Sequence, residues 1–282
     1  MSIEMEVIGQ RNSPYRNKSE DLFGPPVRFV HWLIPGLKAK DVSEWGERAV
    51  KGGVRLMEMQ HRAKKYSPML IIIALGLIGG GLSSDLFDGI LARLIRSEMC
   101  DPEAKLADER EGQVYDPLID GRLEAFQSKE SAETARVLGR PWGVIAAAFS
   151  LGTGNLARTA KSVAGWISRK PVPETYPLKD PRTPGTSIGR KLLYVATVMP
   201  RIPLPVLDRF PLQEVIHAGV GVANLWVTGE RLSAIFTPPL GSELDPKEVD
   251  FAGARARHLG ALSIRNFAEA LSIVRNLTSE AA

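Results

Sequence analysis

The chain has a single cysteine, Cys100, among its 282 residues. One thiol excludes an internal disulfide framework, and it also excludes a zinc or iron–sulfur site built from several cysteines. No histidine lies near Cys100 in the sequence, so the residue is expected to be an inert thiol and not a catalytic nucleophile.

Aromatic residues are also few, at 7%, and no segment alternates polar and apolar residues as a half-buried strand does. Residues that interrupt regular helices and strands are abundant, with 26 glycines and 20 prolines. Their number argues against a long coiled coil or a regular β-sandwich. The apolar fraction of 44% is ordinary for a chain that buries a core. These features predict an all-α protein.

Several motifs of known chemistry are missing. The net charge is only +4 and the basic residues are dispersed, so a nucleic-acid partner is not expected. The glycine-rich segments have neither the Lys-Ser/Thr of a phosphate-binding loop nor the third glycine of a dinucleotide fold, and no serine has a nucleophile-elbow context. Glu4 and Glu6 make the N-terminus unlike a secretory signal.

What the sequence does contain is three long stretches without charge. Residues 67–84 are 18 uncharged residues, residues 141–157 are 17, and residues 215–229 are 15. A helix needs about 20 apolar residues, and at least about 17, to cross a bilayer. The three stretches therefore predict two to three short transmembrane or deeply buried helices, and the third is the shortest.

The charge of the intervening segments changes sign at each stretch. Residues 1–66 carry +4, residues 85–140 carry −5, residues 158–213 carry +7 and residues 214–282 carry −2. Loops rich in Lys and Arg stay on the cytoplasmic or matrix side of a membrane, so this alternation favours a chain that crosses it.

Glycines within these stretches favour close helix packing, because small residues let helix backbones approach one another. The alternative for the run at 79–81 is a break in a core helix. The glycines are Gly79, Gly80, Gly81, Gly152, Gly154, Gly219 and Gly221.

The organisation follows from these stretches and their flanks. Residues 44–62 form an amphipathic helix with its charges in one arc, Asp101–Pro102 and Asp245–Pro246 mark helix starts, and nine prolines lie between 171 and 211.

The predicted segments are an extended arm at 1–41, the first apolar segment with amphipathic flanks at 42–100, an acidic helical loop at 101–140, the second apolar helix at 141–170, a basic, proline-rich extended connector at 171–211, and the third apolar helix with a C-terminal helix at 212–282.

Two Glu-x-x-His pairs are the candidate metal ligands: Glu58 with His61, and Glu214 with His217. Residues i and i+3 share a helix face, and di-iron carboxylate bundles use two such pairs plus a carboxylate from each of two further helices. Asp85 and Asp88 are the best candidates for those further ligands. Against this hypothesis, Glu58 lies in the charged arc with Arg62, and a glutamate at a helix start, such as Glu214, needs no metal to explain it.

Basic pairs at the segment edges are candidates for binding anionic lipid head groups, although solvated loop charges are commoner. They are Arg169, Lys170, Arg190 and Lys191.

Three functions remain open. The favoured one is a non-catalytic accessory or structural subunit of a multi-subunit assembly in an energy-transducing membrane, either the mitochondrial inner membrane or a bacterial cytoplasmic membrane, with other membrane-protein subunits and lipids as partners and no cofactor. The first alternative is a membrane-bound di-iron oxidoreductase that uses the two Glu-x-x-His pairs. The second is a soluble helical binding protein.

Overall fold

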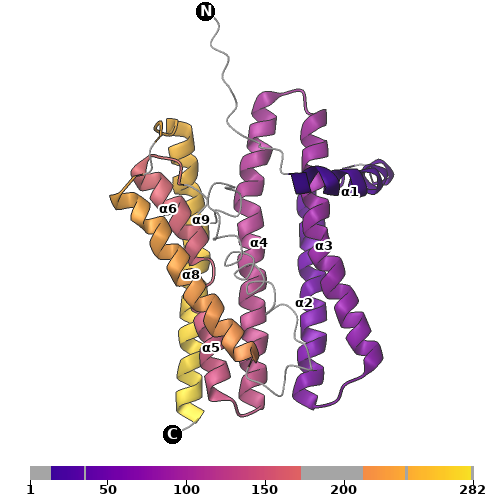
Figure 1. Cartoon of the computed structure of the whole chain (residues 1–282), viewed down its shortest axis with the longest axis vertical. Coiled ribbons are helices and arrows are strands. Elements are labelled where there is room, and N and C mark those ends of the chain that lie inside the picture. Colours follow the sequence, from indigo (N-terminus) through magenta and orange to yellow (C-terminus); the bar gives the residue numbers. More distant parts are fainter. Residues whose placement is uncertain (1–13, 35, 173–211, 239–240, 281–282) are drawn as a thin grey trace, which may run out of the picture.

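The computed structural model describes residues 14–34, 36–172, 212–238 and 241–280, and every regular element within them is a helix. The all-α prediction is therefore confirmed. Figure 1 shows these helices, which are α1 (Pro14–Leu33), α2 (Ala39–Ala63), α3 (Pro68–Glu98), α4 (Pro102–Val137), α5 (Pro141–Thr153), α6 (Leu156–Ser168), α8 (Leu212–Phe236) and α9 (Pro246–Glu280).

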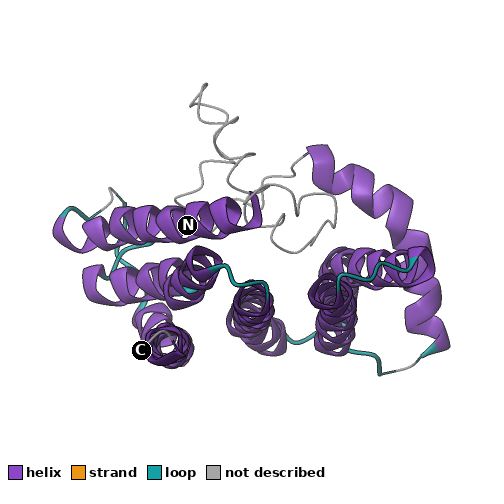
Figure 2. Cartoon of the chain, turned by 90° about the horizontal axis from the view of Figure 1, so that it is seen from below, coloured by secondary structure: helices purple, strands orange, loops and turns teal. Residues whose placement is uncertain are grey.

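Helix α4 lies at the middle of the molecule. The α2–α3 hairpin packs on one side of it, and α5 and α9 pack on the other side (Figures 1 and 2). Helix α6 packs in turn against α9, and α8 packs against α5 and α6. Helix α1 lies across α3. Helix α4 thus lies between two groups of helices and contacts both of them.

Helices α2 and α3 approach closely because glycines lie in their contact. A Cβ atom built on Gly53 would lie 2.6 Å from the carbonyl oxygen of Ala74, and one on Gly81 would lie 2.6 Å from that of Gly46. Valine and isoleucine side chains fill the rest of the interface, with Val50, Val54 and Ile78 at most 2% exposed. The predicted close packing at glycines is confirmed at Gly81, at Gly152 against Ala270 and at Gly221 against the ring of Phe149. Cβ atoms on Gly79, Gly80 and Gly219 would meet nothing within 4 Å.

Two predicted boundaries differ from the structure. Helix α3 continues through the glycines at 79–81 to Glu98, so the apolar segment and its amphipathic flank are one helix. The predicted helix at 141–170 is instead two helices, because Asn155 adopts a left-handed conformation (φ 66°) between α5 and α6. The Asn155 side chain donates to the carbonyl oxygen of Leu259 at 3.1 Å, which holds this turn against α9.

The predicted helix starts are confirmed. The side chain of Asp101 accepts a hydrogen bond from the amide of Glu103 at 2.9 Å, and that of Asp245 accepts one from Lys247 at 2.8 Å. In the predicted extended arm at 1–41, residues 14–33 form helix α1 instead. Of the proline-rich connector, residues 173–211 lie outside the described residues.

Among the described residues, no helix combines the length and the apolar character needed to cross a membrane. This corrects the transmembrane alternative in the prediction of two to three transmembrane or deeply buried helices. The physical reason is clearest for the second stretch. Helix α5 has 13 residues, or roughly 20 Å at the rise of an α-helix, and the chain turns directly after it.

Candidate functional site

Helix α2 carries a buried carboxyl group, Glu58, on the face that packs against α4. Its side chain is 1% exposed. Its two oxygens accept hydrogen bonds from Thr134 Oγ1 of α4 at 2.6 Å and from Gln213 Nε2 of α8 at 3.2 Å. Gln213 also donates to Ser131 Oγ at 2.9 Å, so three helices meet at this group.

Burial raises the pKa of Glu58, because the interior disfavours its charged form. The hydrogen bonds from Thr134 and Gln213 and the nearby Arg62 oppose this shift, and Glu130 adds to it. The group therefore holds a proton more tightly than an exposed glutamate, and it can act as a buried hydrogen-bonding centre or exchange a proton.

Part of the charged arc of α2 faces α4, which the sequence pattern did not indicate, while Arg48 and Arg55 of the same arc are 75% and 61% exposed. Glu47 is 9% exposed and lies 3.1 Å from Arg122 Nη2, and Arg62 Nη2 lies 2.7 Å from Glu130 Oε2. These contacts make an ionic seam, by which we mean the ion pairs of Glu47 and Arg62 with α4. The partners on α4, Arg122 and Glu130, are eight residues apart, whereas Glu47 and Arg62 are fifteen apart. Sequence spacing alone therefore does not predict these pairs.

The second histidine motif lies elsewhere. The Glu214 carboxylate lies beside Gly143 at the start of α5, where a Cβ built on the glycine would be 3.0 Å from Oε1. His217 is 2% exposed and lines a cavity of about 20 Å³, which is room for one water molecule. The other side chains that line this cavity are Glu124, Gln127, Ser128, Ser150, Val220 and Asn224.

His217 is held neutral in this cavity. Neither of its ring nitrogens has a hydrogen-bond partner among the described residues, nor does Nε2 of Gln127. Burial lowers the pKa of His217 to about 4, because the interior disfavours the imidazolium. A neutral imidazole keeps one donor and one acceptor, so the cavity can hold a polar molecule the size of water.

The di-iron alternative does not fit this geometry. Glu58 is engaged with Thr134 and Gln213, His61 lies edge-on to the ring of Tyr66 at 6.4 Å, and His217 occupies a different cavity. In the described part of the chain no three His, Cys, Asp or Glu side chains are placed to share a metal ion. A di-iron centre needs about six such ligands, so the two motifs, although both buried, do not build one.

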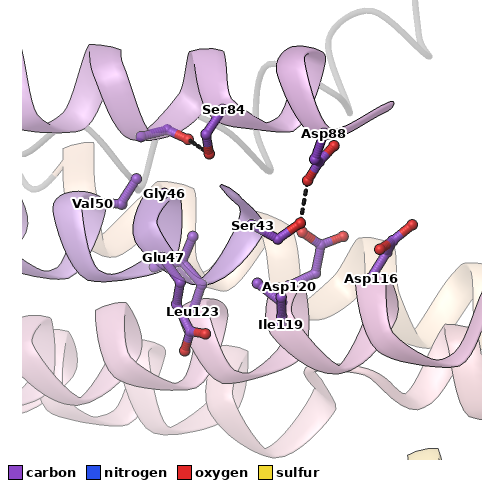
Figure 3. Close-up of a pocket in the computed structure, with 11 residues that line it drawn as sticks. Ser43, Gly46, Glu47, Val50, Ser84, Asp88, Asp116, Ile119, Asp120 and Leu123 are labelled. Carbon is purple, nitrogen blue, oxygen red and sulfur yellow. Dashed lines mark hydrogen bonds between the residues drawn. The ribbon is translucent and has the colours of Figure 1, made fainter. Parts of the chain in front are cut away.

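An acidic cavity of about 60 Å³ lies between α2, α3 and α4 (Figure 3). Four carboxylates line it, those of Glu47, Asp88, Asp116 and Asp120. Two of them are paired with cations, since Lys51 and Arg122 pair with Glu47 and Arg158 lies 3.1 Å from Asp120. Asp88 accepts a hydrogen bond from Ser43. Of the sequence candidates only Asp88 lines it, while nothing is described of the Asp85 side chain.

Two of the basic candidates for lipid binding, Arg169 and Lys170, directly follow helix α6. Arg169 has a left-handed backbone (φ 53°), and its carbonyl oxygen accepts a hydrogen bond from the amide of Leu244 at 2.8 Å. Its side chain is exposed and that of Lys170 is half-buried, so both can meet an anion. Arg190 and Lys191 lie outside the described residues.

The outer face of α8 exposes large apolar side chains at helical spacing. Trp226 is 70% exposed and Phe236 86%, and Val215, Val222 and Leu225 lie on the same face. Sequence reasoning assigned this stretch to a membrane span or a buried core, and the structure leaves it uncovered by any described residue.

Comparison with protein-family models, with curated proteins and with solved structures finds no match to this chain.

Proposed function

We propose that this chain is a non-catalytic subunit of a larger membrane-associated protein assembly, docked on its partners through the outer face of α8. The proposal rests on the exposure of this apolar face, which is formed by Val215, Val222, Leu225, Trp226 and Phe236. Large exposed apolar patches are uncommon on lone soluble proteins and mark interaction surfaces, and tryptophan is enriched among the residues that dominate binding energy.

The distribution of polar groups supports the same proposal. Glu47, Glu58 and His217 are buried between helices, while tryptophan, phenylalanine and isoleucine side chains lie on the surface. A protein alone in water gains by the opposite arrangement, because apolar surface is the costly part to hydrate. A partner that covers α8 would remove this cost.

A membrane location is supported by the alternating charge of the four segments, +4, −5, +7 and −2, and by the apolar outer faces. Whether this is a mitochondrial inner or a bacterial cytoplasmic membrane stays a prediction. The assembly would hold the chain at the membrane without requiring one of the described helices to span it.

The test is the mass of the native particle after gentle detergent extraction from the organism's membranes. We expect the 30.8 kDa chain to be part of a larger particle, and Trp226→Ser to release it. Leu106→Ser is the control, because Leu106 is also exposed (44%) but lies on α4, away from this face.

Recovery of the wild-type chain as a lone monomer would overturn the proposal. Equal release by Trp226→Ser and Leu106→Ser, with both variants folded by circular dichroism, would show that α8 is not the docking face.

A further inference from the structure

The first half of α3 has one face against α2 and the opposite face uncovered. Ala74 and Ile78 are 0% and 2% exposed and contact α2 with Gly81. Met69 and Ile72 on the other side are 71% and 70% exposed. Further exposed residues of this half-helix are Leu70, Ile73, Leu75 and Leu77.

The half-helix that bears this uncovered face, residues 68–80 of α3, contains no side chain that can form a strong hydrogen bond. Protein–protein interfaces carry about one hydrogen bond per 100–200 Å². A face roughly 20 Å long without any donor or acceptor side chain suits lipid chains better, because acyl chains need none.

The charges next to this face are basic. Between residues 59 and 84 the chain has Arg62, Lys64 and Lys65 and no Asp or Glu. Arg62 is turned inward to Glu130, whereas Lys64, Lys65 and Tyr66 are exposed at the turn that precedes α3. Lysine attracts anionic head groups, and tyrosine favours the boundary between head groups and acyl chains.

We propose that the turn at 64–66 and the uncovered face of α3 bind the surface of one lipid leaflet that contains anionic lipids. The helix lies in the plane of the leaflet, with Ile72 and Met69 below the head groups and Lys64 and Lys65 on their phosphates. In-plane helices of this kind enter the boundary by about 5–10 Å. Such binding needs no helix long enough to cross the bilayer.

The lipid contact extends the proposed function, since a subunit of a membrane assembly has to reach the bilayer. It uses a different face from α8, so each proposal can fail separately.

The test is flotation of the purified full-length chain with phosphatidylcholine vesicles, with and without phosphatidylserine. We expect binding that requires phosphatidylserine and weakens with salt. Ile72→Ser should weaken it by at least about tenfold. The matched control is Ile264→Ser on α9, because Ile264 is 73% exposed, close to the value for Ile72.

The charges are tested separately. Lys64→Gln with Lys65→Gln should weaken binding to anionic vesicles by roughly thirtyfold. Lys105→Gln with Lys247→Gln, two exposed lysines elsewhere, should leave it within about twofold.

Three outcomes would overturn the proposal. One is no flotation of the folded wild-type chain with either vesicle, and a second is equal loss with Ile264→Ser. The third is a lipid-free dimer that Ile72→Ser dissociates, which would assign the face to a second copy. Failure here with an intact large native particle would leave the assembly proposal standing.

Discussion

Helix α2 packs on its two neighbours by two different kinds of contact. Against α3 it presents Gly53, Val50 and Val54, and the backbones come close enough to exclude a Cβ atom. Against α4 it presents Glu47, Glu58 and Arg62, which are held by ion pairs and hydrogen bonds. The contact with α3 depends on the close approach of the two backbones. The contact with α4 also packs Leu123 against the buried valines of α2, and it differs by its ion pairs and hydrogen bonds.

An amphipathic helix can therefore bury part of its charged face. The apolar face of α2 is covered by α3, and Glu47, Glu58 and Arg62 of its charged face are covered by α4, which supplies groups of complementary charge and hydrogen-bonding capacity. Polar groups that are fully paired can be buried at little net cost, whereas an unpaired one costs about 1–3 kcal/mol. The two interfaces should therefore respond to mutation in different ways.

The glycine contact should show the largest effect. Gly53→Ala places a Cβ within 2.6 Å of the Ala74 carbonyl oxygen and forces the helices apart, so we expect a loss of about 3 kcal/mol in the free energy of unfolding. Urea unfolding measures it. Gly79→Ala is the matched control: it meets nothing within 4 Å and should gain up to about 1 kcal/mol in helix propensity. Similar losses for both would contradict shape-dependent packing.

The ionic seam should show a smaller loss that depends on the partner. Glu130→Ala leaves Arg62 without its partner at 2.7 Å, so we expect a loss of about 2 kcal/mol. In a double-mutant cycle with Arg62→Ala, part of this loss should be recovered as coupling. The exposed pair of Arg136 and Glu133 is the control, with coupling below about 1 kcal/mol. Equal coupling in both pairs would mean that burial of the seam adds nothing.

Glu58→Gln tests the buried carboxyl group of the same interface through the pH dependence of stability. Burial raises the pKa of Glu58 in the folded state, so the folded protein binds the proton more tightly than the unfolded chain does. The wild-type protein should then lose stability as the pH rises above about 4.5, and the variant should not. Near neutral pH we expect the variant to be more stable by about 1 kcal/mol. Parallel pH profiles from urea unfolding would refute this explanation.

His217 should have the smallest effect at neutral pH, where it is already uncharged. Its pKa is lowered to about 4 in the folded state, so the unfolded chain takes up the proton first as the pH falls. Stability should decline from about pH 6.5 to pH 4, with a slope of at most about 1.4 kcal/mol per pH unit. His217→Gln should flatten this decline, and an unchanged slope would show that another group causes it.

Much of the secondary structure was predictable because its signals are local. Proline at a first helical position and aspartate before it marked the starts of α4 and α9. The turn at Asn155 was missed, because a left-handed residue within an apolar stretch has no strong local signal, and the hydrogen bond to Leu259 that supports it comes from more than a hundred residues away.

The candidate site was only partly predictable. Sequence spacing singled out Glu58, His61 and His217, and all three are buried. It could not say what surrounds them, because Thr134 and Gln213 reach Glu58 from two other helices. The shared spacing therefore suggested one metal centre where the fold makes two separate polar environments.

By itself the sequence determined that this protein is helical, where several helices begin and which stretches are free of charge, because capping, propensity and composition act within a few residues. The tertiary structure alone decided which faces are covered. Whether the charges of α2 meet water or α4, and whether the apolar residues of α3 and α8 meet the core or a partner, depends on which helices pack together.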